Sequence, residues 1–103
     1  MIAAVEEKLA HLPGICEKRR VRRLAVFGSA ATGGFDPSRS DLDILVDFAL
    51  MPPVQHAEAY FGLLEDLQRL FGIEVDLIER GPIRNPYFLQ AIRDTQMVLY
   101  EAA

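Results

Sequence analysis

The stretch DLDILVDF, residues 41–48, decides the fold. Successive side chains of a β-strand point to opposite faces of the sheet, so residues two apart share a face. One of the two sets here is wholly apolar and consists of Leu42, Ile44, Val46 and Phe48. The pattern predicts a strand whose apolar face lies in the core. Asp41, Asp43 and Asp47 then share the opposite face with Leu45.

Upstream of this strand, apolar residues at helical spacing predict a helix over residues 2–12, which Pro13-Gly14 should end. The chain then favours a short helix over residues 15–20 and a buried strand over residues 23–27. Small and turn-forming residues predict a loop over residues 29–40.

Downstream, Met51-Pro52-Pro53 should start a long helix that Gly72 caps. Its expected apolar stripe consists of Val54, Ala57, Phe61, Leu64, Leu67 and Phe71. A second alternating strand is expected over residues 73–79, followed by a helix over 86–95 and a strand over 96–100. The predicted fold class is α/β (α+β), a small mixed β-sheet with helices packed mainly on one face.

Length and composition predict one folded domain over residues 1–103. Half of the residues are hydrophobic and a quarter are charged, as in ordinary globular proteins and unlike disordered chains. The formal net charge of −4 argues against a general nucleic-acid coat protein. No apolar run reaches the roughly 20 residues that span a bilayer, and Glu6, Glu7 and Lys8 argue against a signal peptide. The lack of such a run predicts no membrane partner. Because the single Cys16 cannot form an internal disulfide, we also expect a cytoplasmic protein.

Three carboxylates form the strongest candidate site. Asp41 and Asp43 lie on one strand face, roughly 6.5–7 Å apart along the chain, and Asp76 lies on the polar face of the second alternating strand. If the two strands are neighbours, the three side chains meet and can hold two hard cations, an arrangement known in phosphoryl chemistry. The alternative is that Asp41 and Asp43 form the solvated face of an edge strand. Asp47 lies further along the strand and is left outside the set.

The pair Gly28-Ser29 strengthens the first interpretation. It follows a strand and opens a segment rich in small residues, where backbone N–H groups and a hydroxyl can bind phosphates. Glycine also permits a close approach that a side chain would block. An ordinary turn would contain the same pair, but the two carboxylate-bearing strands that follow make the combination more specific.

The runs Val26-Phe27-Gly28-Ser29 and Ser40-Asp41-Leu42-Asp43-Ile44-Leu45-Val46 resemble the signature of the DNA polymerase beta nucleotidyltransferase superfamily. The short chain and the run Val75-Asp76-Leu77 are similar to its minimal nucleotidyltransferase (MNT) branch. The resemblance implies a nucleotidyltransferase palm core in which Gly28 and Ser29 hold the phosphates of a nucleoside triphosphate. It also implies that Asp41, Asp43 and Asp76 form the catalytic set and bind two Mg²⁺ ions, and that Asp76 helps to activate the acceptor hydroxyl.

Thr32 marks a departure from this branch. Many members carry an arginine a few residues after the Gly-Ser pair, where this chain has Ala30-Ala31-Thr32. Threonine cannot supply the charge of arginine, and Arg39, nearby in the sequence, is a candidate substitute. The departure bears on nucleotide affinity and efficiency, because all three carboxylates are present.

The resemblance implies transfer of a nucleotide, AMP from ATP, to a hydroxyl group on a partner protein. Members of the branch pair with HEPN-domain ribonuclease toxins and act as antitoxins that adenylylate them, so a HEPN toxin is the expected partner in a hetero-oligomer. Two alternatives stay open. One is an antitoxin that blocks its partner by occlusion without catalysis, and the other is a transferase for a small molecule such as an aminoglycoside.

The most basic stretch consists of Lys18, Arg19, Arg20, Arg22 and Arg23. Cations at the end of a short helix complement its dipole, so a solvated face is the expected role. Contact with nucleic acid or an acidic partner is the alternative, although direct nucleic-acid binding is not expected of the protein as a whole. His11 and His56 have no metal-ligand spacing with Cys16, so no zinc site is expected.

Overall fold

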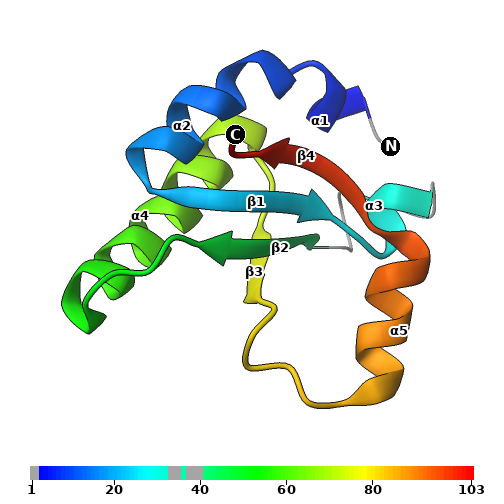
Figure 1. Ribbon diagram of the computed structural model, residues 1–103. Helices are drawn as coiled ribbons and strands as arrows, with labels where there is room; N and C mark the ends of the chain where they lie inside the picture. The colour runs from blue at the N-terminus through cyan, green and yellow to red at the C-terminus, as the bar shows by residue number, and fades with distance from the viewer. Residues whose placement is uncertain (1–2, 33–35, 37–40) are drawn as a thin grey trace.

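The computed structural model describes residues 3–32, residue 36 and residues 41–103. Its centre is a four-stranded sheet with the strand order β3-β2-β1-β4 (Figure 1). β1 (Val21–Val26) pairs antiparallel with both β2 (Leu42–Phe48) and β4 (Met97–Glu101). β2 pairs in parallel with β3 (Val75–Glu79). This mixed sheet with its helices confirms the predicted fold class.

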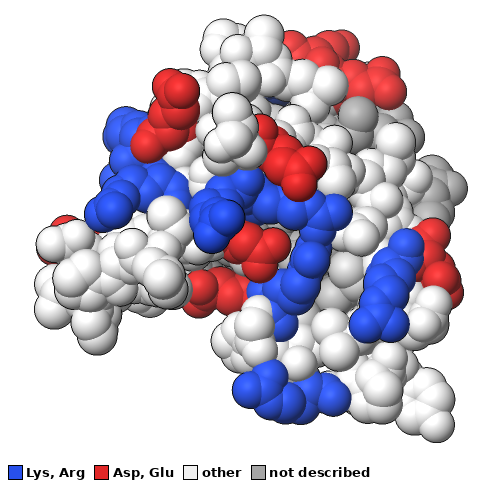
Figure 2. All heavy atoms as spheres, viewed as in Figure 1, with Lys and Arg blue, Asp and Glu red and all other residues white. Residues whose placement is uncertain are grey.

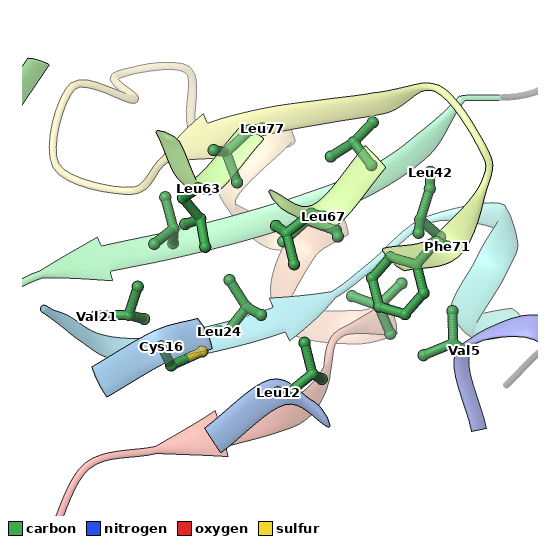
Figure 3. Close-up of a cluster of buried hydrophobic side chains, with 14 of the residues drawn as sticks. Val5, Leu12, Cys16, Val21, Leu24, Leu42, Leu63, Leu67, Phe71 and Leu77 are labelled. Carbon is green, nitrogen blue, oxygen red and sulfur yellow. The ribbon is translucent and has the colours of Figure 1, made fainter. Parts of the chain in front are cut away.

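The larger core lies between the sheet and the helices α2 (Leu12–Lys18) and α4 (Pro53–Phe71). Leu42, Ile44 and Val46 are fully buried in it, which confirms the apolar face predicted for β2. Figure 3 shows the side chains of α2, α4 and the strands meeting in this layer, including Leu12, Cys16, Leu24, Leu63 and Leu67. Burial of these side chains is the main stabilising contribution, at about 1.5–3 kcal/mol for each large aliphatic residue.

The buried face of α4 differs from the predicted stripe. Leu67 and Phe71 are buried and Leu64 is half-buried, but Ala57 is exposed, and Val54 and Phe61 are 71% and 66% exposed. The buried residues are Ala59, Leu63, Asp66, Leu67 and Phe71. The prediction for the first half of the helix was wrong for two reasons. The first turns of α4 extend past the ends of β1 and β2 (Figure 1), which leaves Val54 exposed. Further along, the helix turns Ala59 and Tyr60 to the core in place of Phe61. Helical spacing identifies an apolar face, but it cannot say where the sheet beneath it ends.

The N-terminal helices also differ from the prediction. Instead of one helix over residues 2–12, the chain forms α1 (Ala3–Glu6), the 3₁₀ helix η1 (Leu9–His11) and then α2. Pro13 lies in the first turn of α2, where its missing N–H costs no helical hydrogen bond. Pro13-Gly14 therefore belongs to the start of the second helix, which begins and ends earlier than the predicted 15–20. Val5 and Leu12 are buried, as the helical spacing predicted, and residue 2 lies outside the described residues.

The opposite face of the sheet carries a smaller apolar cluster of Phe27, Leu45 and Ile92. Ile92 belongs to α5 (Pro86–Thr95), whose bounds agree with the predicted helix. Asn85 caps this helix by accepting hydrogen bonds from the N–H groups of Tyr87 and Phe88. α5 thus explains the apolar Leu45 on the otherwise acidic face of β2, because it covers that part of the face.

The predicted loop after β1 begins with one helical turn, α3 (Ser29–Thr32). The rest of that prediction falls on residues that are not described, apart from residue 36. None of the helices in the described part of the chain is long and apolar enough to cross a lipid bilayer.

Candidate functional site

Asp43 and Asp76 are direct partners in the parallel pairing of β2 with β3. Paired residues on neighbouring strands lie about 4.8 Å apart and their side chains point to the same face of the sheet. Asp41 immediately precedes β2 and, two residues from Asp43, lies toward the same face. Asp41 and Asp76 are exposed and Asp43 is half-buried. The structure therefore brings the three predicted carboxylates to one end of one sheet face.

Electrostatics show that these carboxylates interact. The pKa of Asp43 is raised above its ordinary value, first by burial and then by the negative charges of Asp76 and Asp41. Burial removes water from the ionised group, and each neighbouring carboxylate repels it. The repulsion among the three carboxylates is unfavourable, and a bound cation would reduce it.

The three carboxylates do not form a ready-made cage for a cation. Among the described residues, no group of three or more His, Cys, Asp or Glu side chains is arranged to hold a metal ion. Magnesium, however, prefers oxygen ligands and commonly binds through one or two carboxylates together with substrate phosphates and water. The chemistry of this donor set fits a magnesium ion that is bound jointly with a nucleotide.

Gly28 lies against the Asp43 side chain. A β-carbon built on Gly28 would stand 2.8 Å from Asp43 Oδ2, closer than real β-carbons approach their neighbours. Gly28 also has a φ of +69°, a left-handed conformation that side chains disfavour. Its carbonyl accepts a hydrogen bond from the N–H of Ala31, which starts α3 with Ser29 as the first helical residue. Glycine is required here for two reasons, backbone conformation and contact with a carboxylate.

Thr95, the last residue of α5, also belongs to this region, and the sequence analysis missed it. Its hydroxyl oxygen accepts a hydrogen bond from the N–H of Gly28 at 3.1 Å. No pattern in the sequence indicates this contact, because a threonine at the end of a helix is ordinary and Gly28 lies 67 residues away.

Tyr60 connects α4 with the strand that carries Asp76. Its hydroxyl donates to the carbonyl of Leu77 at 2.6 Å. Burial raises the pKa of Tyr60, and the charges of Asp76 and Glu79 raise it further. The ring packs against the larger core.

The basic stretch is partly neutralised by acidic residues. Arg19 donates to Asp66 at 2.7 Å, and Arg23 lies 4.0 Å from Glu101. Figure 2 shows blue and red side chains interleaved on this face, without one continuous basic surface. This arrangement favours the structural and solvated role over nucleic-acid contact. The side chains of Thr32 and Arg39 lie outside the described residues.

Comparison with known sequences identifies the family to which the chain belongs. The family model described as "Nucleotidyltransferase domain" matches residues 10–96. A candidate protein adenylyltransferase of Methanocaldococcus jannaschii is 40% identical over 78 residues, which cover 76% of each chain. The protein adenylyltransferase MntA of Thermococcus cleftensis is 33% identical over 89 residues, which cover 86% of each chain.

Solved structures with the same fold include two toxin–antitoxin complexes. One, crystallised with AMP-PNP, contains a chain that superposes with a TM-score of 0.66 at 19% identity, over 91% of this chain and 73% of that one. The other is a complex of a tri-AMPylated Shewanella oneidensis HEPN toxin with an MNT antitoxin. One chain of that complex superposes with a TM-score of 0.61 at 17% identity, over 94% of this chain and 72% of that one. The family match, the close relatives and the shared fold confirm the resemblance found in the sequence: this chain belongs to the nucleotidyltransferase domain family, in its protein adenylyltransferase group.

Proposed function

We propose that this chain transfers AMP from ATP to a hydroxyl group of a HEPN-domain toxin and thereby acts as its antitoxin. The observation that carries the proposal is the pairing of Asp43 with Asp76 beside the Gly28 turn. Carboxylates that repel one another next to a backbone turn suit a substrate that brings both phosphates and cations. The names of the relatives, protein adenylyltransferases, support AMP as the transferred group.

In the proposed site, Asp41, Asp43 and Asp76 hold two Mg²⁺ ions. Bound magnesium would neutralise the phosphate charge and polarise the α-phosphoryl group. Ser29 and the turn at Gly28 hold the phosphates, and Asp43 acts with Asp41 as a magnesium ligand. The acceptor oxygen forms a bond to the α-phosphorus while the bond to the bridging oxygen of pyrophosphate breaks. Asp76 receives the hydroxyl proton and passes it to water.

A protein acceptor is supported by the relatives and by the complex of an MNT antitoxin with a HEPN toxin that carries AMP. We take residues 1–103 as one domain that carries the catalytic residues. We also place the protein in the cytoplasm, in keeping with its single free cysteine.

Transfer of label from α-labelled ATP tests this function. The chain is incubated with labelled ATP, Mg²⁺ and a HEPN-domain protein from the same genome, and label on the HEPN protein is measured. Asp41→Asn and Asp43→Asn should reduce transfer by at least about a hundredfold, the scale expected when charge stabilisation at a reacting centre is lost.

Asp47→Asn is the matched control. Asp47 lies on the same strand and face, but its carboxylate is 3.8 Å from Arg80 and two side chains away from Asp43. Transfer should survive this change. Inhibition of the toxin without transferred label, and unaffected by Asp41→Asn and Asp43→Asn, would instead establish occlusion. Label on an aminoglycoside and none on protein would establish the small-molecule alternative.

A further inference from the structure

The hydroxyl of Thr95 forms two hydrogen bonds at the end of α5. It donates to the carbonyl of Ala91 at 2.8 Å and accepts from the N–H of Gly28 at 3.1 Å. A hydroxyl has one proton and two lone pairs, so the bond to Ala91 leaves a lone pair directed at Gly28. The helix thus orients the oxygen that holds the glycine turn.

The sheet register explains why these two residues meet. Val26, the last residue of β1, pairs with Met97, the first residue of β4, in an antiparallel ladder. Continuing the ladder by two residues brings Gly28 opposite Thr95. At that point β4 has given way to α5, and the side-chain oxygen of Thr95 accepts the hydrogen bond that a strand carbonyl would otherwise accept.

The turn at Gly28 is held by hydrogen bonds to β2 on one side and to α5 on the other. On one side, the N–H of Phe27 donates to the carbonyl of Asp43 in β2 at 3.1 Å. On the other side, the N–H of the next residue, Gly28, donates to Thr95. The two N–H groups belong to consecutive planar peptide units, Val26–Phe27 and Phe27–Gly28, so the two contacts fix the orientation of the chain on both sides of Phe27.

This orientation matters for Asp43 as well as for the turn. The α-carbon of Gly28 lies so close to Asp43 Oδ2 that no β-carbon would fit between them. A rotation of the Gly28 peptide would move the turn against the carboxylate, and it would also redirect Ser29, the next residue. Thr95, Gly28 and Asp43 therefore form one continuous chain of contacts.

We propose that Thr95 is a positioning residue, whose hydroxyl holds the Gly28 turn in the orientation that aligns Ser29 and Asp43 for the nucleotide. This proposal rests on the proposed function and adds a group from α5 to that site. It also changes the expected role of Gly28. Its N–H is directed to Thr95, so Gly28 serves by close approach, and the phosphates are bound by Ser29 and the groups that follow it.

Two substitutions at Thr95 separate the hydroxyl from the shape of the side chain. Thr95→Val keeps a similar shape and lacks the hydroxyl, whereas Thr95→Ser keeps the hydroxyl. Asp94→Ala is the matched control, because Asp94 is exposed in the same helical turn and accepts its hydrogen bond from Gln90. Melting temperatures of all variants identify any that fail to fold.

The first measurement needs no catalysis. Hydrogen exchange of the Gly28 amide is followed by NMR in the full chain without nucleotide. We expect exchange at least about five- to tenfold faster in Thr95→Val, the change produced by the loss of one hydrogen bond. Thr95→Ser and Asp94→Ala should stay within about twofold of the unsubstituted chain.

The second measurement is the KM for ATP and the kcat of AMP transfer. Thr95→Val should raise KM or lower kcat so that kcat/KM falls about tenfold, and Thr95→Ser should restore it. The proposal is overturned if Thr95→Val and Thr95→Ser behave alike, or if Gly28 exchange quickens while kcat/KM is unchanged. If the unsubstituted chain transfers no label, the proposed function fails, and Thr95 is then judged by Gly28 exchange and by the affinity for ATP with Mg²⁺.

Discussion

Gly28 and Asp43 are in contact across two strands: a β-carbon on Gly28 would lie 2.8 Å from Asp43 Oδ2. The contact joins the turn after β1 to the central carboxylate of β2. It explains why two short motifs separated by more than ten residues form one site. It also gives a direct way to disturb the site without removing a charge.

Gly28→Ala should therefore impair both stability and activity. The left-handed φ costs a non-glycine residue about 1–2 kcal/mol, and the new methyl group displaces the Asp43 carboxylate. We expect a lower free energy of unfolding in urea and a loss of AMP transfer of about a hundredfold or more.

Gly72→Ala provides the control for backbone strain. Gly72 ends α4 with a φ of +66°, and a β-carbon there would meet nothing within 4 Å. The free energy of unfolding should fall by about 1 kcal/mol while transfer continues. Equal losses of transfer in the two variants would show that strain, rather than contact with Asp43, accounts for the effect.

Magnesium with a non-hydrolysable ATP analogue should raise the melting temperature by several degrees. A ligand that binds only the folded state at a hundred times its Kd stabilises it by about 2.7 kcal/mol. Asp43→Asn should abolish this shift and Asp47→Asn should retain it. A melting curve that does not respond to millimolar ligand in the unsubstituted chain would argue against a nucleotide site.

The unliganded chain should gain stability when Asp43 loses its charge. The pKa of Asp43 is raised in the folded state by burial, Asp76 and Asp41. Between the ordinary carboxyl pKa and the raised one, the folded state binds more protons than the unfolded state, so the free energy of unfolding falls as pH rises through this range. Above it, Asp43→Asn should be more stable than the unsubstituted chain in EDTA.

This gain should vanish as pH falls below the ordinary carboxyl pKa, where both states carry the proton. Urea unfolding from neutral to acidic pH measures the difference. A variant that is less stable than the unsubstituted chain at neutral pH in EDTA would contradict the repulsion described for this cluster.

Asp66 is expected to stabilise the packing of α2 on α4. Its carboxylate is 9% exposed and accepts a hydrogen bond from Arg19 Nε at 2.7 Å. The guanidinium lies over Gly62, where a β-carbon would clash with Nη1 of Arg19. Loss of a hydrogen bond to a charged group costs about 1–3 kcal/mol. Because Arg19 is partly solvated, we expect Asp66→Ala to lower the free energy of unfolding by an amount near the lower end of this range.

Glu65→Ala is the comparison for this pair. Glu65 forms an exposed pair with Arg69 one helical turn away, so its loss should cost less than about 0.5 kcal/mol. The Arg19 hydrogen bond, followed by the nearby positive charges, holds the pKa of Asp66 below its usual range. The stabilisation is therefore present above the ordinary carboxyl pKa and is lost as pH falls through the lowered one. Equal effects of the two substitutions would contradict a structural role for Asp66.

Local sequence was sufficient for β2 and α5, although not for the N-terminal helices or the buried face of α4. Alternation over residues 41–48 assigned the core face of β2 and therefore the side on which Asp41 and Asp43 lie, and residues 86–95 matched α5. Backbone geometry imposes the periods of strand and helix on side-chain direction, so such assignments need no knowledge of distant segments. The motifs around Gly28, Asp43 and Asp76 were sufficient for the family as well.

Long-range pairing supplied the remaining facts. The partnership of Asp43 with Asp76 depends on the parallel register of β2 and β3, and the bond from Gly28 to Thr95 depends on the antiparallel register of β1 and β4. The exposure of Val54 depends on where the sheet ends beneath α4, and that of Phe61 depends on which face of α4 packs against the sheet. Each is a relation between segments far apart in the chain, set by how the whole core packs, and no local periodicity contains it.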